Sequence, residues 1–298
     1  MLTPGRDISV VLQGPVHRVP DARAGLNLTA ECIRSARAAL PGCEVIVSTW
    51  DGEDATGLDC DTFVTSPDPG PCDYFIPFSQ NVNRQIVNTL AGLRKATRRF
   101  AVKLRSDTVI EFPAFLEYQY RFPNRGAGAT LFAEKVVASS MGTLDFRKVR
   151  NFFSLSDFFF FGLTTDLITL FDVKLAHRPP GQSPHSAPVV SEQYLMVEAM
   201  RKAGVTIDPA GPWPGSYRTY FRKYSLTWER FLFANFVIAH PSHLGLLLPR
   251  RLYIHAVDYT WWRFDELYDL YCNRPRKRLP LPRRELMLLL ASYLVPPR

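Results

Sequence analysis

The feature that most constrains this chain is the apolar run at residues 100–105, FAVKLR, because charged residues enter it near its end. A strand points successive side chains to opposite faces, so Lys103, Arg105 and the following Asp107 share one face. That face is costly to bury without partners for its charges. In open α/β sheets, ligands bind outside the carboxyl ends of the strands, where Asp107 is placed. Asp107 therefore either serves a ligand or metal ion there, or begins a turn and pairs with Arg105.

Strands and helices alternate along the first hundred residues. Short apolar runs at 8–12, 45–49 and 62–65 have the composition of strands. Apolar residues at helical spacing predict one helix that ends at Pro41 and another over 81–97. This order of elements, with short connections and the strand at 100–105, predicts a mostly parallel sheet with right-handed crossovers.

The second half of the chain predicts elements that extend this sheet. Four consecutive Phe residues must lie mostly in the core, because a surface patch of that size would aggregate. From residue 205 onward the pattern is irregular and aromatic, and we expect short helices packed on the sheet edge. The other expected elements are a helix over 113–120, a strand at about 130–132, the buried Phe strand at 158–161, a lid-like loop at 176–190 and a helix that opens at Ser191.

Charge and cysteine content narrow the possible partners and the compartment. The formal net charge is +8, which favours phosphate-bearing ligands, anionic membrane surfaces or nucleic acid. Five cysteines without a CxxC pair fit a reduced cytoplasmic setting and make zinc improbable. The chain shows no signal peptide pattern and no apolar run of about 18 residues, so we expect neither export nor a spanning helix.

The tail at 274–298 carries most of the excess charge, with seven basic residues against the single acid Glu285. Its apolar stretch, 286–295, is too short to span a bilayer. A helix there would suit a bilayer interface beside anionic lipids. The alternative is a helix docked on the body behind a solvated basic linker.

Six segments in the same order resemble the WavE lipopolysaccharide-synthesis family, whose members are regarded as glycosyltransferases. The resemblance implies a GT-A-like (Rossmann-like) mostly parallel open sheet flanked by helices, with a nucleotide-sugar-binding catalytic domain over 1–260. It thins after about residue 205. The C-terminal helical extension, basic and apolar over 261–298, is therefore predicted from its residues alone. The segments are ISVVLQGPV (8–16), EVIVSTWDG (44–52), NVNRQIVNTLAGL (81–93), VKLRSDT (102–108), SLSDFFFFG (154–162) and SEQYL (191–195).

The resemblance implies a position for a divalent cation, Mg²⁺ or Mn²⁺. GT-A enzymes usually carry Asp-x-Asp after the fourth strand, which puts Asp107 in the metal and diphosphate position. Here Arg105 stands in place of the first Asp. Either metal binding rests on Asp107, substrate phosphates and water, or Arg105 replaces part of the metal's work. His255 is the expected second ligand, with His240 as its competitor.

The same resemblance assigns roles in sugar transfer from a nucleotide-sugar donor to an acceptor hydroxyl. Glu192, at the start of a helix, is the expected catalytic base if configuration inverts. Asp157 either hydrogen-bonds acceptor hydroxyls or belongs to a turn at the strand edge. The donor-binding candidates, besides Arg105 and Asp107, are Gln13 and Gly14 for the nucleobase or ribose, Asp51 for the nucleoside and Arg84 for the diphosphate.

The resemblance thus predicts a transferase that acts on a lipopolysaccharide, capsule or other surface-polysaccharide acceptor. The cysteines favour a cytoplasmic location, and the first of the two interpretations of the tail would make it peripheral on the cytoplasmic face of the inner membrane. A sugar-nucleotide nucleotidyltransferase is the first alternative, although the loop after the first strand has only one glycine, Gly14, where such enzymes have several. A non-catalytic protein that binds anionic polymers is the second. The chain lacks a recognised nucleic-acid module, so we expect no nucleic-acid partner.

Overall fold

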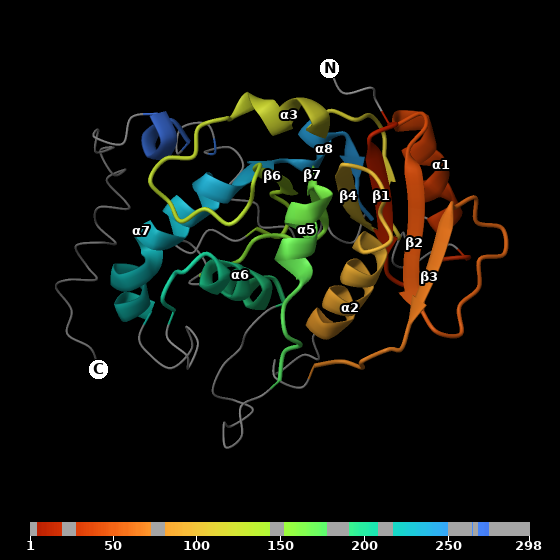
Figure 1. Cartoon of the computed structure of the whole chain (residues 1–298), viewed down its shortest axis with the longest axis horizontal. Coiled ribbons are helices and arrows are strands. Elements are labelled where there is room, and N and C mark those ends of the chain that lie inside the picture. The colour runs from red at the N-terminus through yellow and green to blue at the C-terminus, as the bar shows by residue number, and fades with distance from the viewer. Residues whose placement is uncertain are drawn as a thin grey trace.

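The computed structural model describes residues 5–19, 28–72, 81–143, 152–177, 191–207, 217–249, 264 and 268–273. Within these ranges a seven-stranded sheet has the order β3-β2-β1-β4-β7-β6-β8 (Figure 1). Strand β7 is antiparallel to β4 and β6, and the other neighbouring strands pair in parallel. The predicted mostly parallel open sheet flanked by helices is confirmed. The strands are β1 (Ile8–Gln13), β2 (Glu44–Trp50), β3 (Thr62–Ser66), β4 (Phe100–Arg105), β6 (Val136–Ser139), β7 (Phe159–Leu163) and β8 (Phe236–Ala239).

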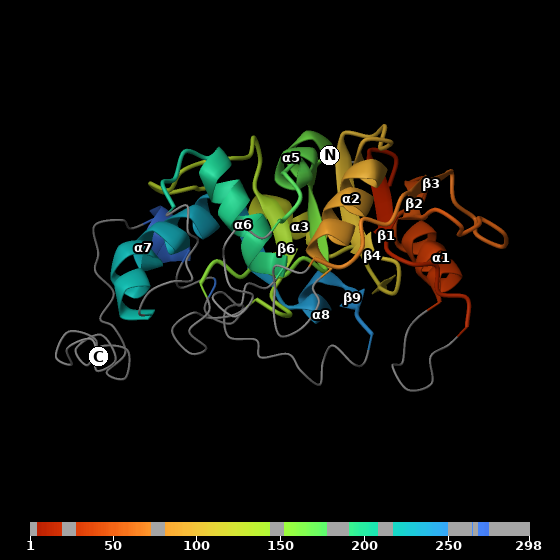
Figure 2. The same cartoon turned by 90° about the horizontal axis from the view of Figure 1, so that it is seen from below.

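Helices cover both faces of the sheet. Figure 2 shows α2, α5 and α6 along one side, and α8 with β9 along the other. The small strands β5 and β9 pair antiparallel to each other, apart from the main sheet. The elements are α1 (Thr29–Ala39), α2 (Val82–Leu93), β5 (Val109–Ile110), α3 (Phe115–Arg121), α5 (Thr164–Phe171), α6 (Ser191–Lys202), α7 (Tyr217–Asn235), α8 (Pro241–Leu244), β9 (Leu246–Leu247) and a π-helix (Asp269–Asn273).

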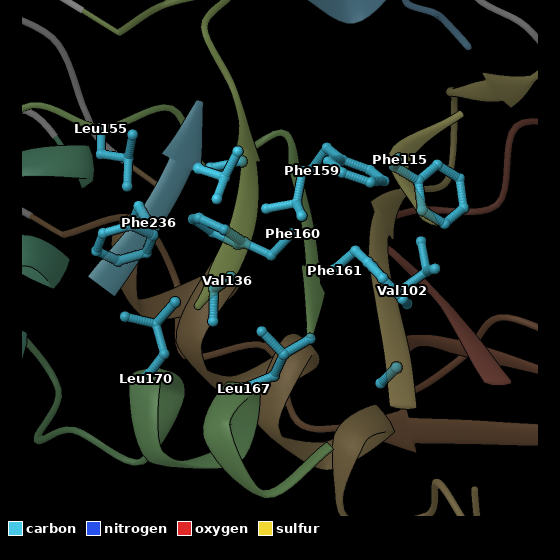
Figure 3. Close-up of a cluster of buried hydrophobic side chains, with 14 of the residues drawn as sticks. Val102, Phe115, Val136, Leu155, Phe159, Phe160, Phe161, Leu167, Leu170 and Phe236 are labelled. Atoms are coloured by element: carbon cyan, nitrogen blue, oxygen red, sulfur yellow. The ribbon is translucent and has the colours of Figure 1, made fainter. Parts of the chain in front are cut away.

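Three residues of the Phe run, Phe159–Phe161, begin β7, and their side chains fill the core on both faces of the sheet (Figure 3). Phe158 precedes the strand and is half-buried. Phe159 and Phe161 pack on Phe115 of α3, with ring centroids 5.2 and 5.1 Å away. Phe160 points to the opposite face, where its ring lies 5.9 Å from that of Phe171 in α5. Alternation along the strand thus buries successive aromatic rings in two layers, as the sequence predicts.

Gly92 allows α2 to approach the sheet closely. A Cβ atom added to Gly92 would lie 2.5 Å from a methyl carbon of Val11 in β1 and 3.0 Å from the Cβ of Ser48 in β2. The hydroxyl of Ser48 also donates to the main-chain carbonyl of Asn88 in α2, at 2.7 Å. These contacts fix the helix over the face of the sheet to which Lys103 points, since Val11 and Lys103 are register partners.

Two predicted elements are wrong. The expected strand at 130–132 is absent, and the sheet strand here is β6, at 136–139. The backbone N–H groups of Leu131 and Phe132 donate to the side-chain oxygen of Asn235, at 2.7 and 3.4 Å, so they join no strand ladder.

The expected short helices after residue 205 are instead the 19-residue helix α7 followed by the sheet strand β8. The buried residues Tyr224, Trp228 and Phe231 of α7 recur at helical spacing, which places them on one face of that helix.

Several expectations fall outside the described residues. These include the basic tail at 274–298, most of the loop at 176–190 and nearly all of the proposed extension at 261–298. None of the helices within the described ranges combines the length and apolar character that crossing a membrane requires. All five cysteines are free thiols.

Candidate active site

The site candidates gather at one edge of the sheet because neighbouring strands end there together. Gln13, the last residue of β1, is the register partner of Arg105, the last residue of β4. Strand β7 runs in the opposite direction, with Phe159 opposite Leu104. The start of β7, preceded by Asp157, therefore lies at the same edge as the end of β4. Such an edge is where ligands bind in open α/β sheets.

Arg105 and Asp107 form a bidentate ion pair at this edge. The Nε–Oδ1 distance is 2.9 Å and the Nη2–Oδ2 distance is 2.6 Å. The side chain of Asp107 is 1% exposed and that of Arg105 is 26% exposed. Burial disfavours the charge on Arg105, but its hydrogen bonds to Asp107 and the negative charges of Asp107 and Asp157 together outweigh burial and raise the pKa of the guanidinium. Asp107 thus lies in a turn after the strand and pairs with Arg105, one of the two arrangements that the sequence predicts.

This ion pair leaves little room for a divalent cation. Both carboxylate oxygens of Asp107 already accept hydrogen bonds from Arg105. Within the described ranges, no three His, Cys, Asp or Glu side chains lie close enough together to hold a metal ion. The expected ligand His255 lies outside those ranges. His240 is the N-cap residue just before α8, and its ring Nδ1 lies 2.7 Å from the hydroxyl of Ser242. The described residues therefore do not fit a GT-A metal site.

A second charged cluster, Lys103 with Asp157 and Glu192, lies next to this pair. Lys103 is fully buried, and its ammonium donates a hydrogen bond to the main-chain carbonyl of Asp157. The side chain of Asp157 is also buried, and neither of its carboxylate oxygens has a hydrogen-bond partner among the described residues. Glu192 lies in the first turn of α6 and is half-buried. Its charge interacts with those of both Asp157 and Lys103.

Burial shifts the pKa values of two residues in this cluster to about 8. Burial, followed by the negative charge of Asp157, raises the pKa of Glu192 to about 8. Burial lowers the pKa of Lys103 to about 8, although the acidic groups around it oppose that change. Perturbed pKa values with a specific charged partner are typical of functional sites. The cluster can therefore hold or release a proton near neutral pH.

The segment that carries Asp157 is held by two helices that are distant in sequence. The side-chain amide of Gln193 in α6 donates to the main-chain carbonyl of Phe152, at 2.6 Å. Phe153 has φ = 60°, an unusual conformation for a bulky residue. Its buried ring lies 5.6 Å from that of Trp228 in α7. These contacts place Asp157 and Glu192 on neighbouring, mutually tethered segments.

The donor-binding candidates occupy different surroundings. Gln13 is buried, and its side-chain oxygen has no partner among the described residues. Gly14 has φ = +127°, and a Cβ atom there would lie 2.9 Å from the hydroxyl of Ser106. Asp51 is exposed just after β2.

Arg84, the remaining donor candidate, is held by an acidic partner of its own. Its guanidinium binds both carboxylate oxygens of Asp68, at 2.7 and 2.6 Å. A diphosphate at Arg84 would therefore compete with Asp68.

The structure thus brings together Arg105, Asp107, Asp157 and Glu192. Lys103 joins them, and sequence reasoning gave it no role. The sequence does contain a signal for Lys103, because a lysine inside an otherwise apolar central strand must be buried or must end the strand.

Comparison with known proteins gives a family match and two distant structural likenesses. The family model described as WavE lipopolysaccharide synthesis matches residues 8–286, well beyond residue 205, where the resemblance was expected to thin. HddC from Yersinia pseudotuberculosis shares 10% identity at a TM-score of 0.31, over 54% of this chain and 78% of that one. The galactosyltransferase LgtC, in complex with donor and acceptor sugar analogues, shares 11% identity at a TM-score of 0.36, over 93% and 99%. No curated protein matches the chain.

Proposed function

We propose that this chain, which belongs to the WavE lipopolysaccharide synthesis family, transfers a sugar from a nucleotide-activated donor to a lipopolysaccharide or other surface-polysaccharide acceptor. The observation that carries the proposal is the juxtaposition of two acidic groups, the buried Asp157 and the half-buried Glu192, with the Arg105–Asp107 ion pair at the carboxyl edge of the sheet. Sugar transfer needs such an arrangement, with acidic groups for the acceptor and a cation for the leaving phosphate.

On the acceptor side, Glu192 is the proposed base and Asp157 the group that orients the acceptor. The acceptor oxygen forms a bond to the anomeric carbon while the bond from that carbon to the phosphate oxygen breaks, and the acceptor proton passes to Glu192. General base catalysis of this kind typically contributes about 10²- to 10⁴-fold. Because the pKa of Glu192 is raised to about 8, the basic form becomes abundant only in mildly alkaline solution.

On the donor side, Arg105 is the proposed partner of the diphosphate. Its guanidinium is partly exposed, whereas Asp107 is not, so a ligand can reach the arginine from outside while the carboxylate holds it from within. Arginine binds phosphate through two parallel hydrogen bonds. We assign neutralisation of the leaving diphosphate to Arg105, because the described residues do not fit a divalent cation. Gln13, Gly14, Asp51 and Arg84 remain the candidates for the rest of the donor.

The partners proposed for this function are a nucleotide-sugar donor, a glycan or glycolipid acceptor and, through the basic tail at 274–298, an anionic membrane surface. A peripheral location on the cytoplasmic face of the inner membrane would give the enzyme access to all three. Flotation with anionic vesicles, for the full chain and for a chain that ends before the tail, tests this part.

The test of the function is thermal stabilisation by UDP, GDP and CMP, each with a chelator and with Mg²⁺ or Mn²⁺. A ligand that binds only the folded state at about 100 times its Kd stabilises by about 2.7 kcal/mol. We expect one nucleotide to raise the melting temperature in the presence of chelator, and its sugar derivatives then to support transfer. A flat panel would contradict the proposal. Stabilisation that requires Mn²⁺ would show instead that Asp107 leaves Arg105 for a metal ion.

A further inference from the structure

Lys103 is a buried cation at the centre of the sheet, and the roles proposed so far do not include it. It lies in β4, between β1 and β7, with no exposed surface. Its ammonium lies 5.8 Å from the centroid of the Phe171 ring in α5 and donates to the main-chain carbonyl of Asp157. A fully buried lysine is rare and requires charged or polar compensation.

The nearby carboxylate of Asp157 is buried without a hydrogen-bond partner among the described residues. Buried carboxylates normally accept hydrogen bonds, yet neither oxygen of Asp157 has a partner among the described residues. The hydrogen bond from Lys103 goes to the main chain of the same residue instead. The ammonium thus compensates the acidic charge through space, while the two carboxylate oxygens keep their lone pairs for another donor.

We propose that Lys103 is a positioning residue of the transfer reaction, which holds Asp157 from the main chain so that its carboxylate can accept hydroxyl groups of a polyhydroxylated acceptor. This inference rests on the proposed function and adds to it a residue and a ligand class. A sugar supplies pairs of hydroxyl donors on adjacent carbons, which is the chemistry that two unpartnered carboxylate oxygens recognise.

The charges that face Lys103 define what its removal would change. They are Asp157 and Glu192 from neighbouring segments, and Arg105 and Asp107 from the end of its own strand. Glu192 faces Asp157 and Lys103, and the ammonium lowers the pKa of Glu192 against the larger effect of burial. Loss of the ammonium should therefore move the titration of Glu192 to higher pH.

Lys135 provides a matched control. It is also buried and donates to a main-chain carbonyl, that of Asn124. Its ammonium lies 4.5 Å from the ring centroid of Tyr268. Burial lowers its pKa to about 8, as for Lys103. Lys135 precedes β6, whereas Asp157 lies at the opposite edge of the sheet. A purely structural role for a buried lysine would give the same result at both positions.

The experiment compares Lys103→Met with Lys135→Met. We expect both to lower the melting temperature, but only Lys103→Met to raise the acceptor KM, by at least about tenfold, with a smaller effect on the donor KM. The titration of the Glu192 carboxyl, followed by infrared spectroscopy with Glu192→Gln as reference, should move to higher pH only in Lys103→Met. Equal behaviour of the two variants would overturn the inference.

A double variant keeps the test decisive if Lys103→Met does not fold. Lys103→Met/Asp157→Asn removes the ammonium together with the carboxylate it compensates, and should melt at a higher temperature than Lys103→Met. Lys135→Met/Asp157→Asn should show no such recovery over Lys135→Met, and a recovery there would contradict the inference. The titration and melting measurements need no turnover, so a shift in Glu192 without any sugar transfer would count against the proposed function alone.

Discussion

The guanidinium of Arg105 clasps the carboxylate of Asp107 two residues away, with Nε–Oδ1 and Nη2–Oδ2 distances of 2.9 and 2.6 Å. The pair closes the end of the central strand β4. GT-A enzymes usually carry two acidic residues at this position, whereas this chain carries one positive and one negative residue. The exposed side of the pair is the cation. The exposed positive charge of Arg105 favours an anionic ligand, and we propose that this ligand is the donor diphosphate.

Breaking this pair from one side should destabilise the protein strongly. Arg105→Met leaves the buried Asp107 carboxylate without its partner, and we expect a loss of about 3–5 kcal/mol in the free energy of unfolding. Arg105→Met/Asp107→Leu removes both charges and should recover most of that loss. Urea denaturation measures both values. An Arg105→Met variant as stable as wild type would show that Asp107 is not held by Arg105.

Glu192 should control the pH dependence of the reaction. Its pKa is raised to about 8, so the ionised base accumulates as pH rises through that value. We expect kcat/KM of the wild type to rise up to about pH 8 and then level, and Glu192→Gln to lose about 10²- to 10⁴-fold of the plateau value. Initial rates across pH at low acceptor concentration check this. A wild-type profile already flat from pH 6 would contradict it.

The same shift predicts a pH-dependent difference in stability. The folded protein binds the Glu192 proton more tightly than the unfolded chain, whose ordinary pKa is 4.5. Its stabilising contribution is therefore complete below about pH 4.5 and is lost as pH rises to about 8. Glu192→Gln lacks this titration. Relative to wild type, the variant should gain stability between these pH values, measured by denaturant unfolding at several pH values.

Arg84 separates a surface ion pair from a donor contact. Its partner Asp68 is about two-fifths exposed, so Arg84→Ala should change the free energy of unfolding by at most about 1 kcal/mol. If Arg84 binds the diphosphate, the donor KM should nevertheless rise. Arg94→Ala is the matched control, because Arg94 forms a similar exposed pair with Asp172. Equal donor KM values for the two variants would remove Arg84 from the donor site.

Phe153 should be a major anchor of the segment that carries Asp157. Its ring is fully buried against Trp228 of α7, and its φ of 60° is strained for a side chain of this size. We expect Phe153→Ala to cost about 3–5 kcal/mol, through loss of packing. Phe112, which is about half exposed, is the control, and Phe112→Ala should cost far less. Calorimetric melting of both variants gives the comparison.

Local sequence patterns predict much of the fold. The strands of the first hundred residues and the buried Phe strand follow from apolar runs and alternation, which act over a few residues. Prediction from local patterns fails for α7. Its residues Tyr224, Trp228 and Phe231 have helical spacing, but nearby aromatic residues at other spacings hide this pattern in the sequence. The strand β8 that follows is a strand because β6 lies beside it.

For the site, the sequence by itself determined that Lys103, Arg105 and Asp107 share one face of a strand and that Glu192 begins a helix. Only the tertiary structure decided how these charges are partnered. Asp157 comes beside Lys103 because β7 runs antiparallel to β4, and Glu192 joins them because α6 is tied to the segment before β7. Electrostatic energy depends on distance and burial, which a linear pattern of charges does not contain.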